Sequence, residues 1–385
     1  MAYLRSIGWL LLFVLLTGCE HDRTLPADDP QKIYLHWIPG FAGYSRSDME
    51  TGLAWSLSYL GAMLPEGSLA EAIHYSGPDS SRFELDLGSV GFPESALAPV
   101  MTIMGRIKQS EEYHVRGAAS LGRFLVLTLH SSWHYYEITG IPQNLEAFLE
   151  INQVDNLLVF PVLQSTVGLE HRVLKFQLSE DPGRMAFLAE DTDGVLSSPD
   201  YPIYGYEVFD VMPNGQLRFA IYDAEGQLAP AAPANRTRAG KPSKCLWCHE
   251  SKAQPLFAPS PNIDGYMTRQ DFHLLIDSTN QTLDQYRRVL SADIQYSQRQ
   301  DHTQSELLYI SFMEPSLQVI AREWNCPLEE VESKFREFPS HLHGEFPQLG
   351  EIYHRRWVDS LAPYRPLEVP ESVREPNSRE PDFFR

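Results

Sequence analysis

Two cysteines and a histidine lie within five consecutive residues, Cys245-Leu246-Trp247-Cys248-His249. Residues three apart on a helix share a face, so both thiols can point the same way. Two thiols at this spacing can form thioether bonds with the two vinyl groups of one porphyrin, and the adjacent imidazole can then bind its iron. The stretch therefore predicts one covalently held haem c per chain, with Cys245, Cys248 and His249 as the residues that hold it.

The N-terminus predicts export, which attachment of this kind requires. Residues 1–16 carry one cation, Arg5, and end in an apolar run that is too short to remain as a membrane-spanning helix. The run leads into Leu16-Thr17-Gly18-Cys19, which resembles the bacterial lipobox. That resemblance implies cleavage before Cys19 and lipidation of Cys19, and Glu20 in place of Asp implies transfer to the periplasmic face of the outer membrane. A plain signal peptide with an incidental cysteine, or a single anchor helix, are the alternatives.

The small number of cysteines limits the alternative roles of Cys245 and Cys248. The chain has four cysteines, and lipid and haem would occupy three of them, which leaves Cys326 as a small buried side chain. Alternatively, Cys245 and Cys248 could form a disulfide, or could bind zinc if His341 and His343 completed the ligand set.

The motif is that of the c-type cytochromes, and residues 240–357 resemble such a domain, with specific agreement only at the two cysteines and the histidine. The resemblance implies a haem wrapped by short helices and a proline carbonyl that accepts the imidazole proton, for which Pro255, Pro259 and Pro261 all qualify. Four cations precede the motif closely and could pair with the haem propionates or form a solvated loop. These cations are Arg236, Arg238, Lys241 and Lys244.

The sixth iron ligand decides the chemistry, and several residues could provide it. In single-haem electron carriers it is commonly a methionine some tens of residues after the motif, which points to Met313, with Met267 as the nearer alternative. Either methionine could equally be core packing. The remaining candidates are His273, His302, His341, His343 and His354.

The hydrophobic pattern predicts an α+β protein, in which a mixed N-terminal domain ends in an antiparallel sheet and a mainly helical cytochrome c-like domain follows. Helical spacing occurs at 49–64 after a capping box at 47–50, and at 93–107, 268–276, 283–290, 305–324 and 328–335, whereas 121–136 suits helix or strand. Alternation of period two predicts strands at 158–160, 173–176, 204–211 and 217–222. We expect a lipoprotein signal peptide at 1–18, a tether at 19–30, an α+β domain of unknown role at 31–233, a helical c-type haem domain at 234–362 and an extended or disordered tail at 363–385.

The net charge of the chain limits the classes of molecule that it can bind. The formal charge is −20, from 51 acidic and 31 basic residues, which argues against binding to nucleic acid. The leading hypothesis is a membrane-anchored electron carrier with a redox partner protein. A peroxidase- or oxidase-type haem enzyme with an open distal site, reached by His134 or Arg123, is the alternative, and a non-haem interaction lipoprotein with a CxxC disulfide is the third. No Ser-His-Asp, Walker or zinc-protease motif accompanies the haem motif.

Overall fold

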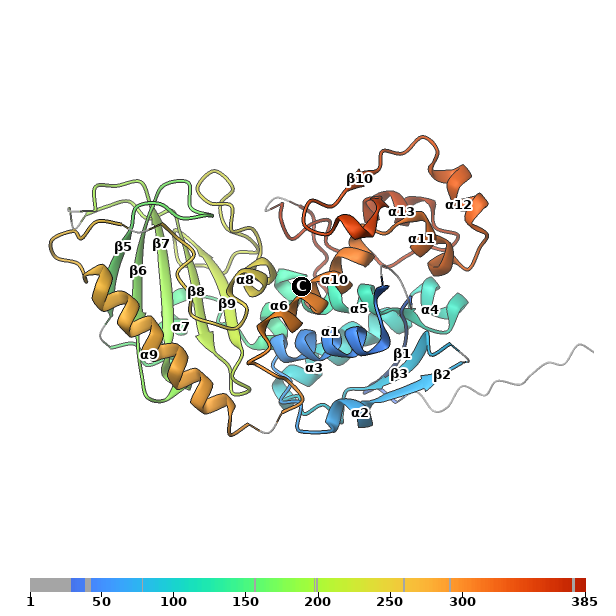
Figure 1. Cartoon of the computed structure of the whole chain (residues 1–385), viewed down its shortest axis with the longest axis horizontal. Coiled ribbons are helices and arrows are strands. Elements are labelled where there is room, and N and C mark those ends of the chain that lie inside the picture. The colour runs from blue at the N-terminus through green and yellow to red at the C-terminus, as the bar shows by residue number, and fades with distance from the viewer. Residues whose placement is uncertain are drawn as a thin grey trace, which may run out of the picture.

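The computed structural model describes residues 29–38, 43–77, 79–155, 157–196, 198, 200–258, 260–290, 292–375 and 378–385. The predicted signal peptide and Cys19, the predicted lipidation site, lie outside these residues. The described chain is an α+β protein, as the sequence predicts, with an antiparallel sheet of five strands beside a mainly helical half (Figure 1). Within the described residues, no helix combines the length and the apolar character needed to cross a membrane.

The helical half contains a small four-stranded sheet of order β2-β3-β1-β4. Its strands are β1 (Lys32–His36), β2 (Ile73–Ser76), β3 (Arg82–Asp86) and β4 (Ala119–Ser120). The helices between residues 46 and 151 are α1 (Arg46–Tyr59), α2 (Ser68–Ala72), α3 (Glu94–Lys108), α4 (Glu111–Arg116), α5 (Leu121–Thr128), α6 (Ser132–Thr139) and α7 (Leu145–Ile151). The ambiguous stretch 121–136 is therefore helical. It forms two short helices that are buried almost throughout.

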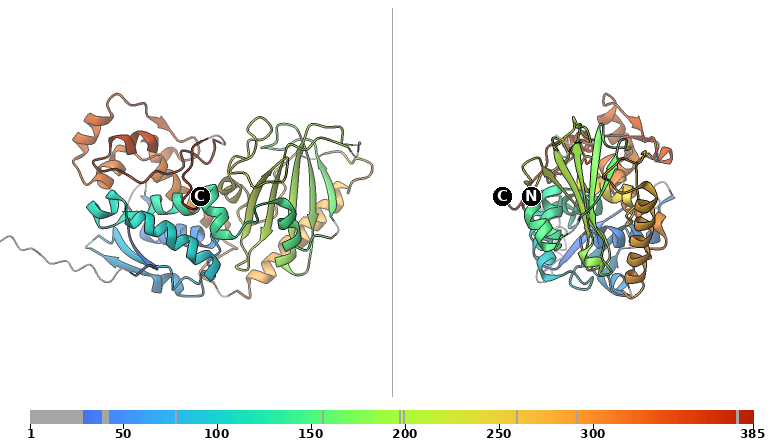
Figure 2. Two further views of the ribbon diagram at one scale, coloured as in Figure 1. Left: turned by 180° about the vertical axis from the view of Figure 1, so that it is seen from behind. Right: turned by 90° about the vertical axis from the view of Figure 1, so that its left-hand side faces the viewer.

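The five-stranded sheet is a simple antiparallel meander, β5-β6-β7-β8-β9. Its strands are β5 (Leu158–Val162), β6 (His171–Gln177), β7 (Ala186–Thr192), β8 (Gly205–Val211) and β9 (Leu217–Asp223). All of the predicted strands are confirmed, and β7 is an additional one. Helix α9 (Arg269–Arg287) crosses one face of the sheet, and α7 lies on the other, where Phe148 contacts Tyr222 (Figure 2).

The helices after residue 300 return to the first half of the chain. They are α10 (His302–Met313), α11 (Leu317–Trp324), α12 (Leu328–Phe335) and α13 (Arg355–Leu361), with a two-stranded ladder of β10 (His341–Leu342) and β11 (Glu351–Ile352) between the last two. Helix α10 packs against α1 and α5. Gly52 in α1 permits the close approach of α10, because an added Cβ at this position would lie 2.7 Å from the carbonyl oxygen of Gln304 in α10. Segments on both sides of residue 233 therefore share one hydrophobic cluster.

Four predicted helical segments have different boundaries in the structure. The capping box of α1 is formed by Ser45 and Asp48 rather than by Ser47 and Glu50, because the Ser45 side chain accepts the N–H of Asp48 while Asp48 accepts that of Ser45. The two segments predicted at 268–276 and 283–290 are one helix, α9. The segment predicted at 305–324 is two helices, since Pro315 interrupts it between α10 and α11.

The C-terminal tail follows an extended path along the protein and has no regular element in its described residues. Val369 and Val373 are buried in the main hydrophobic cluster. Glu380 forms a buried ion pair of 2.5 Å with Lys241, and the backbone N–H of Phe383 donates to Nε2 of His134. The described part of the tail therefore packs onto the rest of the chain.

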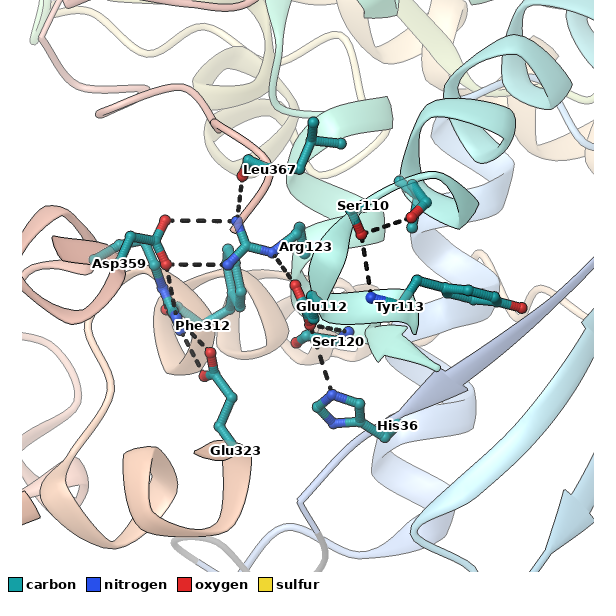
Figure 3. A network of polar contacts seen from close by, with 12 residues as sticks. His36, Ser110, Glu112, Tyr113, Ser120, Arg123, Phe312, Glu323, Asp359 and Leu367 are labelled. Carbon is teal, nitrogen blue, oxygen red and sulfur yellow. Dashed lines mark hydrogen bonds and ion pairs between the residues drawn. The ribbon is translucent and has the colours of Figure 1, made fainter. Parts of the chain in front are cut away.

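A buried ionic network joins the helical elements (Figure 3). Arg123, which is 0% exposed, forms ion pairs with Glu112 at 2.6 Å and with Asp359 at 3.0 Å. Arg355 continues the network to Glu323 at 2.7 Å. Burial alone would raise the pKa of Glu112, but the charge of Arg123 and the hydrogen bond with His36 bring it down to about 2. Glu112 therefore remains an anion inside the protein and depends on its cation.

Replacing Arg123 by a neutral residue should destabilise the folded protein. We expect Arg123→Met to lower the free energy of unfolding by about 3–5 kcal/mol, because Glu112 would remain buried without its partner. Urea unfolding followed by far-UV circular dichroism measures this, and Arg46→Met, which breaks the exposed pair with Glu50, should change stability by less than about 1 kcal/mol. Equal losses in the two variants would contradict the role given to Arg123.

Candidate haem site

The motif occupies one short helix, α8 (Pro242–His249), which packs against β9. Pro242 is favourable in its first turn because its fixed φ suits the start of a helix and no N–H is needed there. Cys245 and Cys248 are three residues apart on this helix, and both are free thiols. Burial raises the pKa of both thiols, so each is protonated at neutral pH.

The turn after α8 orients the imidazole of His249. Glu250 and Ser251 both have left-handed backbone conformations, with φ of 49° and 64°, and they turn the chain back toward the helix. This brings the carbonyl oxygen of Lys252 to 3.3 Å from Nδ1 of His249. The Lys252 carbonyl accepts from Nδ1–H, and Nε2 is left as the nitrogen that can bind a metal.

The Lys252 carbonyl therefore makes the contact that the cytochrome resemblance implies for a proline carbonyl. Pro255 lines the pocket beside the motif, Pro261 is exposed, and Pro259 lies outside the described residues. Burial lowers the pKa of His249 to about 4, so its ring is neutral at pH 7. A neutral imidazole is the form that serves as a metal ligand.

Cys245, Cys248 and His249 line one pocket, whose empty volume is about 1020 Å³ including the part open to solvent. The opposite walls are the face of the five-stranded sheet, the first turns of α9 and the loop 253–257. Most of the lining side chains are apolar, including Val162, Leu174, Phe187, Phe209, Phe219, Leu256, Phe257, Phe272 and Ile276. A pocket with sheet walls differs from the all-helical surroundings that the cytochrome resemblance implies.

Four phenylalanines in register cross the sheet at this pocket. Phe176, Phe187, Phe209 and Phe219 are direct neighbours on β6, β7, β8 and β9. Their successive ring centroids are 5.5, 4.4 and 5.4 Å apart. The ring of His249 lies on the last two, 5.6 Å from Phe209 and 5.2 Å from Phe219. The sheet therefore supports the imidazole directly and shields it from water.

The pocket lining also contains charged side chains, and one of them, Arg172, is paired with two carboxyl groups. Arg172 pairs with Asp191 at 2.8 Å and with Glu207 at 2.6 Å, and it also donates to the hydroxyl of Thr237. Burial and the charge of Glu207 raise the pKa of Asp191 to about 7, against the opposing effect of Arg172. Arg172 belongs to no recognisable sequence motif. It faces Asp191 only because of the register between β6 and β7.

The two methionines proposed as sixth ligand lie in different places. Met267 packs in a cluster with Phe160 and Phe272, next to the pocket wall, but is not among the lining residues. Met313 is buried at the end of α10 and borders a groove formed with Arg355 and the C-terminal arm. Among the described residues that line the pocket, His249 is the only histidine and there is no methionine.

His134 and Arg123, the residues proposed for the distal side of a haem enzyme, form contacts outside the pocket. Nδ1 of His134 lies 2.6 Å from the carbonyl oxygen of Leu127, and Arg123 belongs to the ionic network described above. Neither residue lines the pocket, which removes the support for such a role.

Of the four cations that precede the motif, Lys244 is the only one that lines the pocket. Arg236 instead pairs with Asp193, and Lys241 with Glu380. His341 and His343 are absent from the pocket lining as well, so the structure does not bring together the zinc ligand set with Cys245 and Cys248. Cys326 is half-buried beside a separate hydrophobic cluster.

Comparisons of the chain with protein-family models, with curated proteins and with solved structures gave no match. The chemistry of the site therefore rests on its own residues.

The Asp191 carboxyl should make stability depend on pH. Because its pKa is about 7 in the folded chain and about 4 in the unfolded one, the folded state holds the extra proton between these values. This contribution to the free energy of unfolding therefore falls as the pH rises from about 4 to about 7. Asp191→Asn lacks this contribution. The free energy of unfolding of the variant should therefore increase relative to that of the wild type as the pH rises from about 4 to about 7.

Urea unfolding of both proteins at intervals across this pH range measures the difference. Glu180→Gln, which changes an exposed carboxylate, is the control and should follow the wild type. A constant difference between Asp191→Asn and the wild type would show that the carboxyl titrates normally in the folded protein.

Proposed function

We propose that this chain is a c-type haem protein that transfers electrons in the bacterial cell envelope. The observation that supports this most directly is that two free thiols and a neutral imidazole line the same apolar pocket. Cys245 and Cys248 would hold the porphyrin through two thioethers, and His249 would bind its iron through Nε2. A bound haem would supply a one-electron iron couple.

The surrounding residues fit such a group. The Lys252 carbonyl fixes the tautomer of His249 and increases its basicity, which stabilises the oxidised metal. The phenylalanines of β7, β8 and β9 exclude water from the imidazole, which keeps reorganisation small during electron transfer.

The charges of the pocket favour one orientation of the propionates. Arg172 is already paired with the carboxyl groups of Asp191 and Glu207, so its charge is largely compensated before any further anion approaches it. Lys244 is half-buried at the lining, and its ammonium group donates to a backbone carbonyl rather than to a carboxylate. Lys244 is therefore the better partner for a propionate.

The proposed location rests on the sequence before the described residues. Lipidation of Cys19 would anchor the protein at the periplasmic face of the outer membrane, with 20–30 as a tether. Electron transfer in that compartment requires a redox partner protein, and the net charge of −20 favours a basic one.

A second function has one observation in its favour. Since no second histidine and no methionine line the pocket among the described residues, the iron could keep an open sixth position. Such a protein would bind a small exogenous ligand or react with peroxide instead of only carrying electrons.

Covalent attachment is the first point to test. The full chain should be produced in a bacterium with the haem-attachment machinery and then analysed by denaturing gel, haem stain and intact mass. We expect covalent haem in the wild type, a loss of most of it in Cys245→Ala and Cys248→Ala, and no covalent haem in the double variant. Cys326→Ala is the matched control and should retain it. A colourless wild type with the mass of the polypeptide and lipid would contradict the proposal.

The sixth ligand can be identified by spectroscopy of the same samples. For an electron carrier, we expect a low-spin ferric spectrum and no carbon monoxide binding, with the low-spin signature lost in Met267→Ala but kept in Met313→Ala, because Met267 packs beside the pocket wall. A high-spin ferric spectrum with rapid binding of carbon monoxide by the ferrous protein would instead favour the open site. A low-spin signature that persists in both variants would exclude both methionines.

A further inference from the structure

Three potential metal ligands converge far along the chain from the haem motif. Glu314 follows the last residue of α10, His341 lies in β10, and His354 precedes α13 as its N-cap. One ligand atom from each residue lies within 4.8 Å of those of the other two. Their spacing in the sequence is too wide to form a recognisable motif, so only the fold brings them together.

The contacts within this cluster hold the imidazoles together. Nε2 of His341 lies 3.1 Å from a carboxylate oxygen of Glu314. The rings of His341 and His354 are stacked, with centroids 4.5 Å apart and planes inclined by 26°. Glu314 and His341 are half-buried, whereas His354 is exposed, so an ion from solvent can reach the cluster. Within the part of the chain that the structure describes, the His354 ring has no hydrogen-bond partner.

The backbone around the cluster is well anchored. The Tyr353 N–H donates to the carbonyl of Pro315 at 3.0 Å, which ties the chain before His354 to the chain after Glu314. His341 pairs with Ile352 in the β10–β11 ladder. Arg355, next to His354, donates to the carbonyl of Phe312. The three side chains therefore belong to one corner of the fold, whose backbone is held together by these hydrogen bonds.

His343 does not belong to the cluster. Its Nδ1 accepts the backbone N–H groups of Glu345 and Phe346, at 3.3 and 3.2 Å. This imidazole therefore stabilises a turn. The pairing of His341 with His343 that the sequence suggested is replaced by a pairing of His341 with His354.

We propose that Glu314, His341 and His354 form a binding site for a divalent transition-metal ion, with Zn²⁺ as the ion that fits best. Two imidazoles and one carboxylate are a common three-ligand set for zinc, and a water would take the fourth tetrahedral position. The nitrogen donors disfavour Ca²⁺ and Mg²⁺, which prefer oxygen ligands. The ion would link the end of α10 to β10 and α13 and would thus stabilise this corner of the fold.

The test measures Zn²⁺ binding by the full chain, purified without a histidine tag and stripped of metal. Competition with a chromogenic chelator gives stoichiometry and affinity, and thermal unfolding with and without Zn²⁺ gives an independent readout. We expect one ion per chain and a higher Tm with Zn²⁺. Glu314→Gln, His341→Ala and His354→Ala should each weaken binding at least about tenfold, the lower limit for losing even an outer partner of a metal site.

Two controls make the result specific. His273→Ala removes an exposed imidazole outside the cluster and should leave Zn²⁺ affinity unchanged. The Cys245→Ala/Cys248→Ala chain should bind Zn²⁺ as tightly as the wild type, because its thiols are not ligands in this proposal.

The outcomes are distinct from those for haem. Absence of stoichiometric Zn²⁺ binding, equal affinity in the three cluster variants and the wild type, or loss of binding in the double cysteine variant would each overturn the proposal. Circular dichroism of the metal-free variants checks that they are folded. If His341→Ala or His354→Ala is not folded, Glu314→Gln, which preserves the shape of the side chain, decides the question.

Discussion

Aromatic packing across β6, β7, β8 and β9 is the interaction on which the site depends. The four phenylalanines share one face because each strand holds its register with the next, and a slip of one residue would send a ring to the opposite face. Stacking of Phe187 on Phe209 at 4.4 Å and the contact of Phe219 with His249 connect the sheet to α8. The pocket exists because α8 and α9 pack along this face and leave space between them.

The sequence predicted much of the sheet but not β7, and the reason is physical. The strand reads Ala-Phe-Leu-Ala-Glu-Asp-Thr, and its consecutive acidic residues resemble those of an exposed loop. In the fold, Glu190 pairs with Lys175 and Asp191 pairs with Arg172, both across the β6–β7 ladder. Their burial depends on partners from another strand, which a local hydrophobic pattern cannot indicate.

The grouping of the two thiols and the imidazole was predictable because they lie on about one helical turn, whereas the walls of the pocket that they line were not. Local spacing in the sequence was enough to place Cys245, Cys248 and His249 close together. The pocket lining depends on long-range packing, and so does the position of Met313, which α10 carries away from the pocket by packing on α1 and α5. The sequence suggested both methionines from distance along the chain, a quantity that does not measure distance in space.

The orientation of the imidazole depends on a strained turn that a distant helix stabilises. Glu250 and Ser251 are left-handed without being glycines, and each such residue costs on the order of 1–3 kcal/mol. Arg287 from α9 offsets this cost, because its guanidinium donates to the carbonyl of Ser251 at 2.7 Å and to that of Gly215. The same cation thus ties the turn to the β8–β9 hairpin. The Lys252 carbonyl reaches His249 only because the turn is held there, so α9 positions the imidazole as well as covering the pocket.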